Sequence, residues 1–121
     1  MTDKDIRRIV DLEDVDNMIE FGLNTEQKEK AMEYAIEHNK LKILSALVKD
    51  FNPENERQEN FLFLACQKQN EKALQILCGA QKKWNSQQIH VAYEYAWSEK
   101  FFHIIHSLYF LTGQWFERKK G

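Results

Sequence analysis

Residues 60–79 read NFLFLACQKQNEKALQILCG, and this stretch decides the fold class. Its first half places apolar side chains one, three and four residues apart, the pattern of a helix that buries one face. A polar corner follows at residues 67–71, after which the apolar pattern resumes and ends at Gly79, a residue that favours a left-handed cap. The stretch therefore predicts two short helices that pack against each other.

The same pattern recurs on both sides of this stretch. Aligning Ala65 with Ala35 toward the N-terminus superposes seven apolar positions without a gap, and aligning it with Ala96 toward the C-terminus does the same. The small residue at this position is thus alanine in all three copies. Close helix packing requires a small residue, because a larger one would overpack the contact. The alternative is a chance alignment, since all helices share a period of about 3.6 residues.

The pattern divides the chain into units at residues 3–22, 25–51, 53–79 and 86–113, with a tail at 114–121. The first unit is a degenerate copy of the pattern. It has one apolar stripe on each predicted helix: Ile6, Ile9 and Val10, then Val15, Met18 and Ile19. Matching Val15 and Ile19 to Ile43 and Leu47 puts Arg7 at the alanine position. A polar outer face is typical of a capping repeat, so we expect this unit to cap the N-terminal end.

Polar residues and glycines mark where the predicted helices begin and end. Asn24 or Thr25 is the expected N-cap of the second unit, and Asn85 or Ser86 that of the fourth. Asn52-Pro53 predicts that the helix containing Phe61 starts as early as Pro53. Gly22 and Gly113 end helices, and Trp84 is expected to be exposed in a polar loop.

Composition indicates one all-α domain over residues 1–121. Its 121 residues are 43% hydrophobic and include four Gly and one Pro, too few breakers for an all-β sandwich. The net charge of −2 does not favour nucleic-acid binding. Residues 1–60 carry a net −6 and residues 61–121 a net +4. Such polarity steers an acidic end toward a basic partner or promotes head-to-tail association; the alternative is simply solvated helix faces.

Cys66 and Cys78 have apolar or aromatic counterparts in the other units, so we expect both to be buried, reduced and unreactive. The opening MTDKDIRRIVDLED is charged from its start and is no secretory signal. No apolar run reaches the ~18 residues of a membrane span. These features predict a cytoplasmic protein, with export by a non-classical route left open, and no membrane partner.

The sequence contains only weak signals for a catalytic or metal-binding site. Glu99, His103 and His106 have spacings of four and three and could face one side of a helix as metal ligands, but two histidines on a helix are more often solvated surface. A nucleophilic role for Cys66 or Cys78 needs an adjacent base, and the sequence supplies none. Phosphate-binding loops, Gly-x-Ser-x-Gly and Cys-x-x-Cys are missing from the sequence. We therefore predict no catalytic, cofactor or metal site.

Two segments carry a family resemblance. DLEDVDNMIEFGLN, residues 11–24, is similar to the second helix and loop of an ankyrin repeat, and FLFLACQKQNEKALQIL, residues 61–77, resembles the body of another, with Ala65 in the usual small position. The likeness is degenerate, because the Thr-Pro-Leu-His opening is missing and the spacing from Ala35 to Ala65 to Ala96 is shorter than the period of about 33 residues of ankyrin units. The resemblance implies seven or eight short helices, in antiparallel pairs stacked as an array that binds other proteins.

Aromatic residues that break the pattern are the candidate protein-binding sites. Phe63 aligns with Glu33 and Glu94, and Phe101 with Lys40 and Asn70, so these positions are polar in the other units. The candidates are Phe63, Trp84, Phe101, Phe102 and Trp115. The alternative is that they form an aromatic cap on the core, with Trp115 and Phe116 folded back over the last unit.

The predicted function is a non-catalytic protein-protein interaction module, an adaptor or an inhibitor that regulates a partner protein or enzyme. The alternative from another class is a self-associating structural protein, with a homodimer as one form. A small helical enzyme or metal-binding protein ranks third. Oligomeric state distinguishes the first two, and metal analysis addresses the third.

Overall fold

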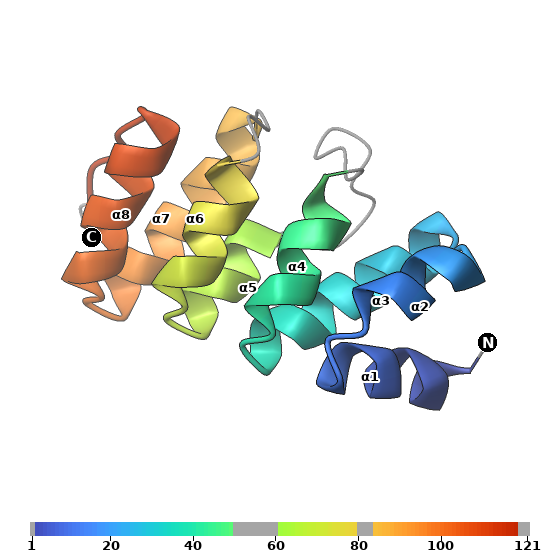
Figure 1. Cartoon of the computed structure of the whole chain (residues 1–121). Helices are drawn as coiled ribbons and strands as arrows, with labels where there is room; N and C mark the ends of the chain where they lie inside the picture. The colour runs from blue at the N-terminus through green and yellow to red at the C-terminus, as the bar shows by residue number, and fades with distance from the viewer. Residues whose placement is uncertain (1, 50–60, 80–83, 119–121) are drawn as a thin grey trace.

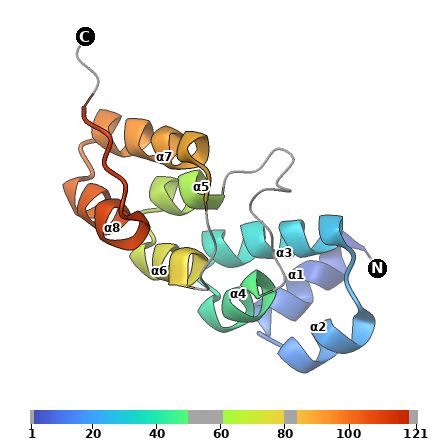
Figure 2. The same cartoon turned by 90° about the horizontal axis from the view of Figure 1, so that it is seen from above.

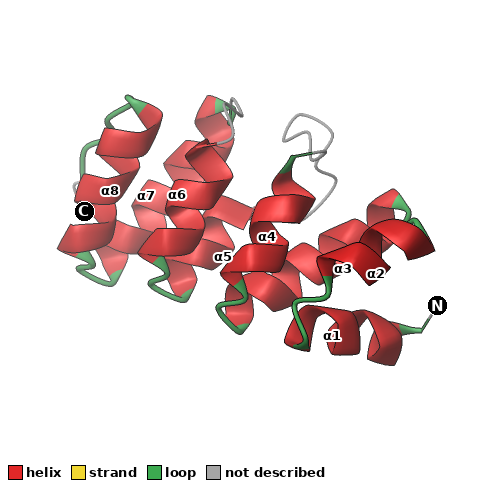
Figure 3. Cartoon of the chain, viewed as in Figure 1, coloured by secondary structure: helices red, strands yellow, loops and turns green. Residues whose placement is uncertain are grey.

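The computed structural model describes residues 2–49, 61–79 and 84–118, and these residues form eight helices and no strand (Figure 3). The helices are α1 (Asp3–Asp11), α2 (Val15–Phe21), α3 (Thr25–Glu37), α4 (Leu41–Val48), α5 (Phe61–Gln67), α6 (Glu71–Gly79), α7 (Ser86–Ser98) and α8 (Phe102–Thr112). The all-α prediction is confirmed. The predicted helix start at Asn52-Pro53 lies outside the described residues.

Capping boxes, in which two side chains satisfy backbone N–H groups reciprocally, begin α1, α3 and α7. Asn24 and Gln27 form the box of α3, where the Gln27 N–H donates to Asn24 Oδ1 over 2.8 Å. Asn85 and Gln88 form the same box at α7, also at 2.8 Å. These caps confirm Asn24 and Asn85 over the alternatives Thr25 and Ser86.

The corner inside each helix pair has a repeated backbone geometry. Its turning residue has a positive φ in every pair: Glu13, Asn39, Gln69 and Lys100. The next residue donates its N–H back across the corner, as from Asn70 to Ala65 O over 2.9 Å and from Phe101 to Ala96 O over 2.9 Å. This bond satisfies carbonyls at the end of the first helix. The residues at these corners are not glycine, so their left-handed backbone conformation has an energetic cost.

Glycine ends two of the helices, as predicted. Gly22 closes α2 and Gly113 closes α8, both with positive φ. The predicted left-handed cap at Gly79 is wrong, because Gly79 is the last residue of α6 and is not among the glycines with positive φ.

The helices lie in two layers (Figures 1 and 2). The first helices of the pairs contact one another in the order α1, α3, α5, α7, and the second helices in the order α2, α4, α6, α8. Within each pair the two helices also contact each other. The first pair lies at one end of the molecule and the last pair at the other (Figure 1).

The core lies between the layers and contains the recurring alanines. Ala35, Ala65 and Ala96 are fully buried, and each accepts the cross-corner hydrogen bond of its pair. In the first pair the same bond runs from Asp14 N–H to Ile9 O over 3.0 Å. The placement of Arg7 at the alanine position is therefore wrong. Ile9 occupies that position, because the corner at Glu13 corresponds to the corner at Asn39.

This corner alignment also explains α2. Met18 is buried as predicted, but Ile19 is exposed, so its assignment to the buried stripe is wrong. With the corners superposed, Ile19 matches Ser45, which is exposed as well. The apolar stripe of α2 is thus narrower than its sequence indicates.

Candidate functional site

The last helix pair is covered by the residues that follow it. Gln114 to Phe116 run from α8 back over α7 (Figure 2). The Tyr93 hydroxyl donates to the Gln114 carbonyl over 2.7 Å, and the Trp97 indole N–H donates to the Phe116 carbonyl over 3.0 Å. The expectation that Trp115 and Phe116 fold back over the last unit is confirmed.

Trp115 connects the aromatic rings at this end. Its ring centroid lies 5.6 Å from that of Tyr109, 5.9 Å from Tyr93 and 6.0 Å from Trp97, all in edge-to-face geometry. Phe102 joins the cluster through Trp97, at 6.3 Å. Edge-to-face contacts of this kind stabilise aromatic pairs beyond the area they bury.

Three members of this cluster keep about half of their surface in solvent. Phe102 is 56% exposed, Tyr109 53% and Trp115 47%. Phe102 and Tyr109 are two helical turns apart on α8 and so lie on the same side of that helix. We call Phe102, Tyr109 and Trp115 the C-terminal face. Phe110 is more exposed still, but no ring contact ties it to the described members of the cluster.

The predicted site residues divide into three groups. Phe102 and Trp115 lie on the C-terminal face, which Tyr109 completes. Phe63 and Phe101 are half-buried and both contact Tyr95, at centroid distances of 5.0 and 6.0 Å. The alignment places both in positions that are polar elsewhere, but Tyr95 shields them from much of the solvent.

Trp84 forms the third group and corrects the sequence analysis. It is 5% exposed, and its indole N–H donates to the Leu77 carbonyl over 3.2 Å. The expectation of an exposed tryptophan in a polar loop is wrong, because the ring packs into the core against α6. A side chain so covered stabilises the fold and is not an exposed anchor for a partner.

Sequence analysis missed Tyr109 as a site residue. The repeat alignment matches it to Cys78 and to Val48, which is buried. In the inner pairs this position is largely covered, whereas the last pair has no described helix beyond it. Two facts read together could have identified Tyr109: it belongs to the last unit, and it occupies a position that the next pair covers only in the inner units.

The thiols behave as buried apolar groups. Cys66 is buried, Cys78 is largely buried, and both are free. Burial raises the pKa of the Cys66 thiol to about 12 and that of Cys78 to about 11, so both stay protonated near neutral pH. The thiolate is the nucleophilic form, so this environment opposes the nucleophilic role considered above.

The ligand hypothesis for Glu99, His103 and His106 has no support in the geometry. All three side chains are exposed. Within residues 2–49, 61–79 and 84–118, no three His, Cys, Asp or Glu side chains are grouped to hold a metal ion. No helix in the described part of the chain is long and apolar enough to cross a membrane.

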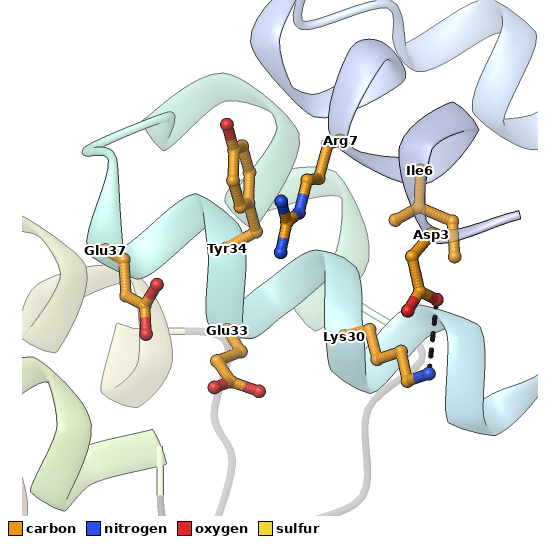
Figure 4. Close-up of a pocket in the computed structure, with 7 residues that line it drawn as sticks. All are labelled: Asp3, Ile6, Arg7, Lys30, Glu33, Tyr34 and Glu37. Atoms are coloured by element: carbon orange, nitrogen blue, oxygen red, sulfur yellow. Dashed lines mark hydrogen bonds and ion pairs between the residues drawn. The ribbon is translucent and has the colours of Figure 1, made fainter.

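A shallow pocket of charged residues lies between α1 and α3 (Figure 4). Lys30 Nζ lies 3.2 Å from Asp3 Oδ1, and the Arg7 guanidinium carbon lies 5.7 Å from the centroid of the Tyr34 ring. Hydrogen bonding with Asp11, together with burial, raises the pKa of Tyr34. These surface contacts join the first two pairs, and ion pairs between exposed groups contribute little stability.

A second groove opens at the outer side of α1 and α2 and has a volume of about 480 Å³. It is lined by Asp5, Arg8, Ile9, Leu12, Asp14, Asn17 and Phe21. Leu12 and Phe21 are both more than half exposed. We call the seven lining residues the N-terminal face.

Two carboxylates on the N-terminal face are fixed by capping. Hydrogen bonds from the Thr2 backbone and side chain lower the pKa of Asp5, which is therefore ionised near neutral pH. Asp14 caps α2 by accepting the Asn17 N–H over 3.2 Å. The face therefore combines two exposed apolar side chains with fixed carboxylates.

Comparison of the chain with protein-family models gave no match, and neither did comparison with curated proteins or with solved structures.

Proposed function

We propose that this chain is a non-catalytic protein-interaction module built as a degenerate ankyrin-like array, which acts as an adaptor or an inhibitor of a partner protein. The observation that carries the proposal is the C-terminal face, where three aromatic side chains are grouped and half exposed. Clustered Phe, Tyr and Trp are typical anchors of protein interfaces.

The layered helix pairs support the ankyrin-like interpretation. In such arrays each pair contacts its neighbours, and the ends carry the unmatched surfaces. The contacts run from pair to pair in both layers, with an alanine or Ile9 at the same point of each pair. Because both thiols are free, a reducing compartment such as the cytoplasm suits this module.

Affinity capture from the source cell tests the proposal. We expect the wild-type chain to recover a protein that the double variant Phe102→Ser/Tyr109→Ser loses, because each anchor contributes about 2 kcal/mol when buried in a partner. The matched control is Phe110→Ser, which changes an exposed aromatic of α8 outside the C-terminal face. Recovery that is equal for all three chains contradicts the proposal.

A further inference from the structure

The acidic excess of the described structure lies in its first helix pair. Residues 2–21 contain seven acidic and three basic side chains, a net charge of −4. The other described segments are nearly neutral, with +1 over residues 22–49, +1 over 61–79 and −1 over 84–118. Because the first pair lies at one end of the molecule (Figure 1), this negative charge is gathered at that end.

The N-terminal face is a groove between the two helices of this pair. Asp5, Ile9 and Leu12 follow one side of α1, and Phe21 is the last residue of α2. Because the chain reverses between the helices, Leu12 and Asp14 lie at the corner end of the groove, and Asp5 and Phe21 lie toward its other end. The two ends are ~10 Å apart, the length of two helical turns. Each end therefore combines a carboxylate with an exposed apolar side chain.

The groove offers apolar surface as well as charge. Leu12 and Phe21 are more than half exposed, and the buried Ile9 lies between α1 and α2 as the floor. A groove of about 480 Å³ lies within the range of ~300–1,000 Å³ found for binding pockets. Terminal repeats of arrays normally have polar outer faces. Exposed apolar side chains around a groove at such an end therefore indicate an interaction surface.

Hydrogen bonds within the pair fix the two carboxylates. Asp5 Oδ2 accepts the Thr2 N–H over 3.1 Å and the Thr2 hydroxyl over 2.9 Å. Asp14 accepts the Asn17 N–H over 3.2 Å and the Asn17 side-chain amide over 2.6 Å. A carboxylate has about four acceptor sites, so each still has the capacity to accept a donor from a partner. Their fixed positions reduce the cost of ordering on binding.

We propose that the N-terminal face binds a basic, partly apolar segment of a different protein. Lys or Arg side chains of the segment pair with Asp5 and Asp14, and its apolar side chains cover Leu12 and Phe21. The charge of −4 attracts such a segment and repels nucleic acid and anionic lipid surfaces. The other described segments of this chain carry at most +1, which favours a different protein over a second copy.

This surface and the C-terminal face lie on different helix pairs, so the two bind independently. The chain then has one acidic and one aromatic binding surface, at opposite ends of the molecule (Figure 1). An adaptor requires two such separate surfaces.

Selection from a random library of short displayed peptides tests the proposal. The library is selected on the full wild-type chain and, in parallel, on the variant Leu12→Ser/Phe21→Ser. Peptides recovered by the wild type alone should be enriched in Lys or Arg next to large apolar residues. Recovered peptides without a basic excess overturn the proposal, as does a selection in which the wild type alone recovers none.

Charge variants then separate electrostatic recognition from apolar contact, with fluorescence anisotropy of a selected peptide as the measurement. Asp5→Asn/Asp14→Asn should weaken binding about tenfold, and high salt should weaken wild-type binding too. Arg8→Gln removes the single basic lining residue and should strengthen binding about twofold or more. The matched control Glu26→Gln/Glu99→Gln removes two exposed carboxylates outside the groove and should bind almost as the wild type does. Equal binding by all these chains overturns the proposal.

Circular dichroism should show unchanged helix content in the groove variants. Leu12, Phe21 and Arg8 are exposed, and asparagine keeps a capping oxygen where it replaces aspartate. Loss of binding in these variants therefore reports on the groove and not on unfolding.

Two further measurements address other occupants and other sites. Light scattering in which the wild-type mass rises with concentration, and that of Leu12→Ser/Phe21→Ser does not, would assign the groove to a second copy and overturn the proposal. The selected peptides should bind Phe102→Ser/Tyr109→Ser as tightly as the wild type, and loss of binding there would place them on the C-terminal face instead. The proposed function is judged separately, by capture of a protein through the C-terminal face.

Discussion

Among the described residues, the first and last helix pairs each have one side without a neighbouring pair, and the two sides differ in how they are covered. At the C-terminal end, Gln114 to Phe116 cover α7 and accept hydrogen bonds from Tyr93 and Trp97. At the N-terminal end, the described residues place no such segment over α1 and α2, and Leu12 and Phe21 are exposed. The end faces are therefore half covered at one end and open at the other.

The two ends of the array differ in how their polar atoms are satisfied. The backbone carbonyls of the tail satisfy the polar atoms of two aromatic residues that extend into the end face. The first pair instead has carboxylates and an asparagine at its end, which remain hydrated without a cover. The aromatic end consequently depends on tertiary contacts more than the acidic end does.

The largest effect is expected from a charge at the alanine position. Ala65→Glu buries an unpaired carboxylate in a fully buried site, at a cost of several kcal/mol, comparable with a domain's whole stability of about 5–15 kcal/mol. The variant should lose cooperative thermal unfolding by circular dichroism. Ile9→Glu changes the equivalent position of the end pair and should unwind α1 while leaving amide protection in α3 to α8. An Ala65→Glu variant with the wild-type melting temperature contradicts the alignment.

Aromatic truncation at the two ends gives the next effect. Trp97→Ala removes the hydrogen bond to Phe116 and the ring contacts with Trp115 and Phe102, at an expected cost of about 2–3 kcal/mol. Phe21→Ala changes an exposed ring and should cost less than about 0.5 kcal/mol. Urea unfolding of both variants measures the difference. Equal costs would mean that the two ends are equally covered.

Alkaline pH should lower the free energy of unfolding through the two buried thiols. The folded pKa values of about 12 for Cys66 and about 11 for Cys78 lie above the ordinary value of 9.0. Between pH 9 and these values the unfolded chain loses thiol protons that the folded chain keeps, so stability is full below pH 9 and falls as pH rises. The slope is about 1.4 kcal/mol per pH unit for each thiol.

Cys66→Ala isolates this contribution, because other groups also titrate in the same range. The unfolding free energy of Cys66→Ala should fall less steeply than that of the wild type from about pH 9 to about pH 11, by the slope of one thiol. Parallel slopes would show that Cys66 ionises in the folded protein, and would revive a reactive role for it.

The smallest effect is expected at the corners. Lys100 has a φ of 59°, so Lys100→Gly should stabilise the fold by about 0.5–1 kcal/mol by relieving left-handed strain. Glu13 has a φ of 49°, but its Oε1 accepts the Lys42 N–H over 3.1 Å, so Glu13→Gly should be nearly neutral. Gln75→Gly, inside α6, is the control and should destabilise by about 0.5–1 kcal/mol. Urea midpoints rank the three variants.

The candidate site was only partly predictable. Phe102 and Trp115 were identified because they break the pattern or lie outside it, and both contribute to an exposed face. Phe63 and Phe101 break the pattern too, yet Tyr95 covers them in part. Alignment reports which positions differ between units, whereas exposure depends on side chains that other helices contribute.

The sequence by itself determined the helix pairs, their approximate bounds and two neighbouring candidates for each N-cap, Asn24 or Thr25 and Asn85 or Ser86. These features are local, since a period of about 3.6 residues and a side chain close to a free N–H act within one segment. The tertiary structure decided the burial of Trp84, the position of Ile9 and the path of Gln114 to Phe116. Each of these depends on an atom outside the segment concerned: the Leu77 carbonyl of α6 for Trp84, the Asp14 N–H beyond the end of α1 for Ile9, and the donors of Tyr93 and Trp97 on α7 for the tail. Periodicity within a single helix carries no information about such partners.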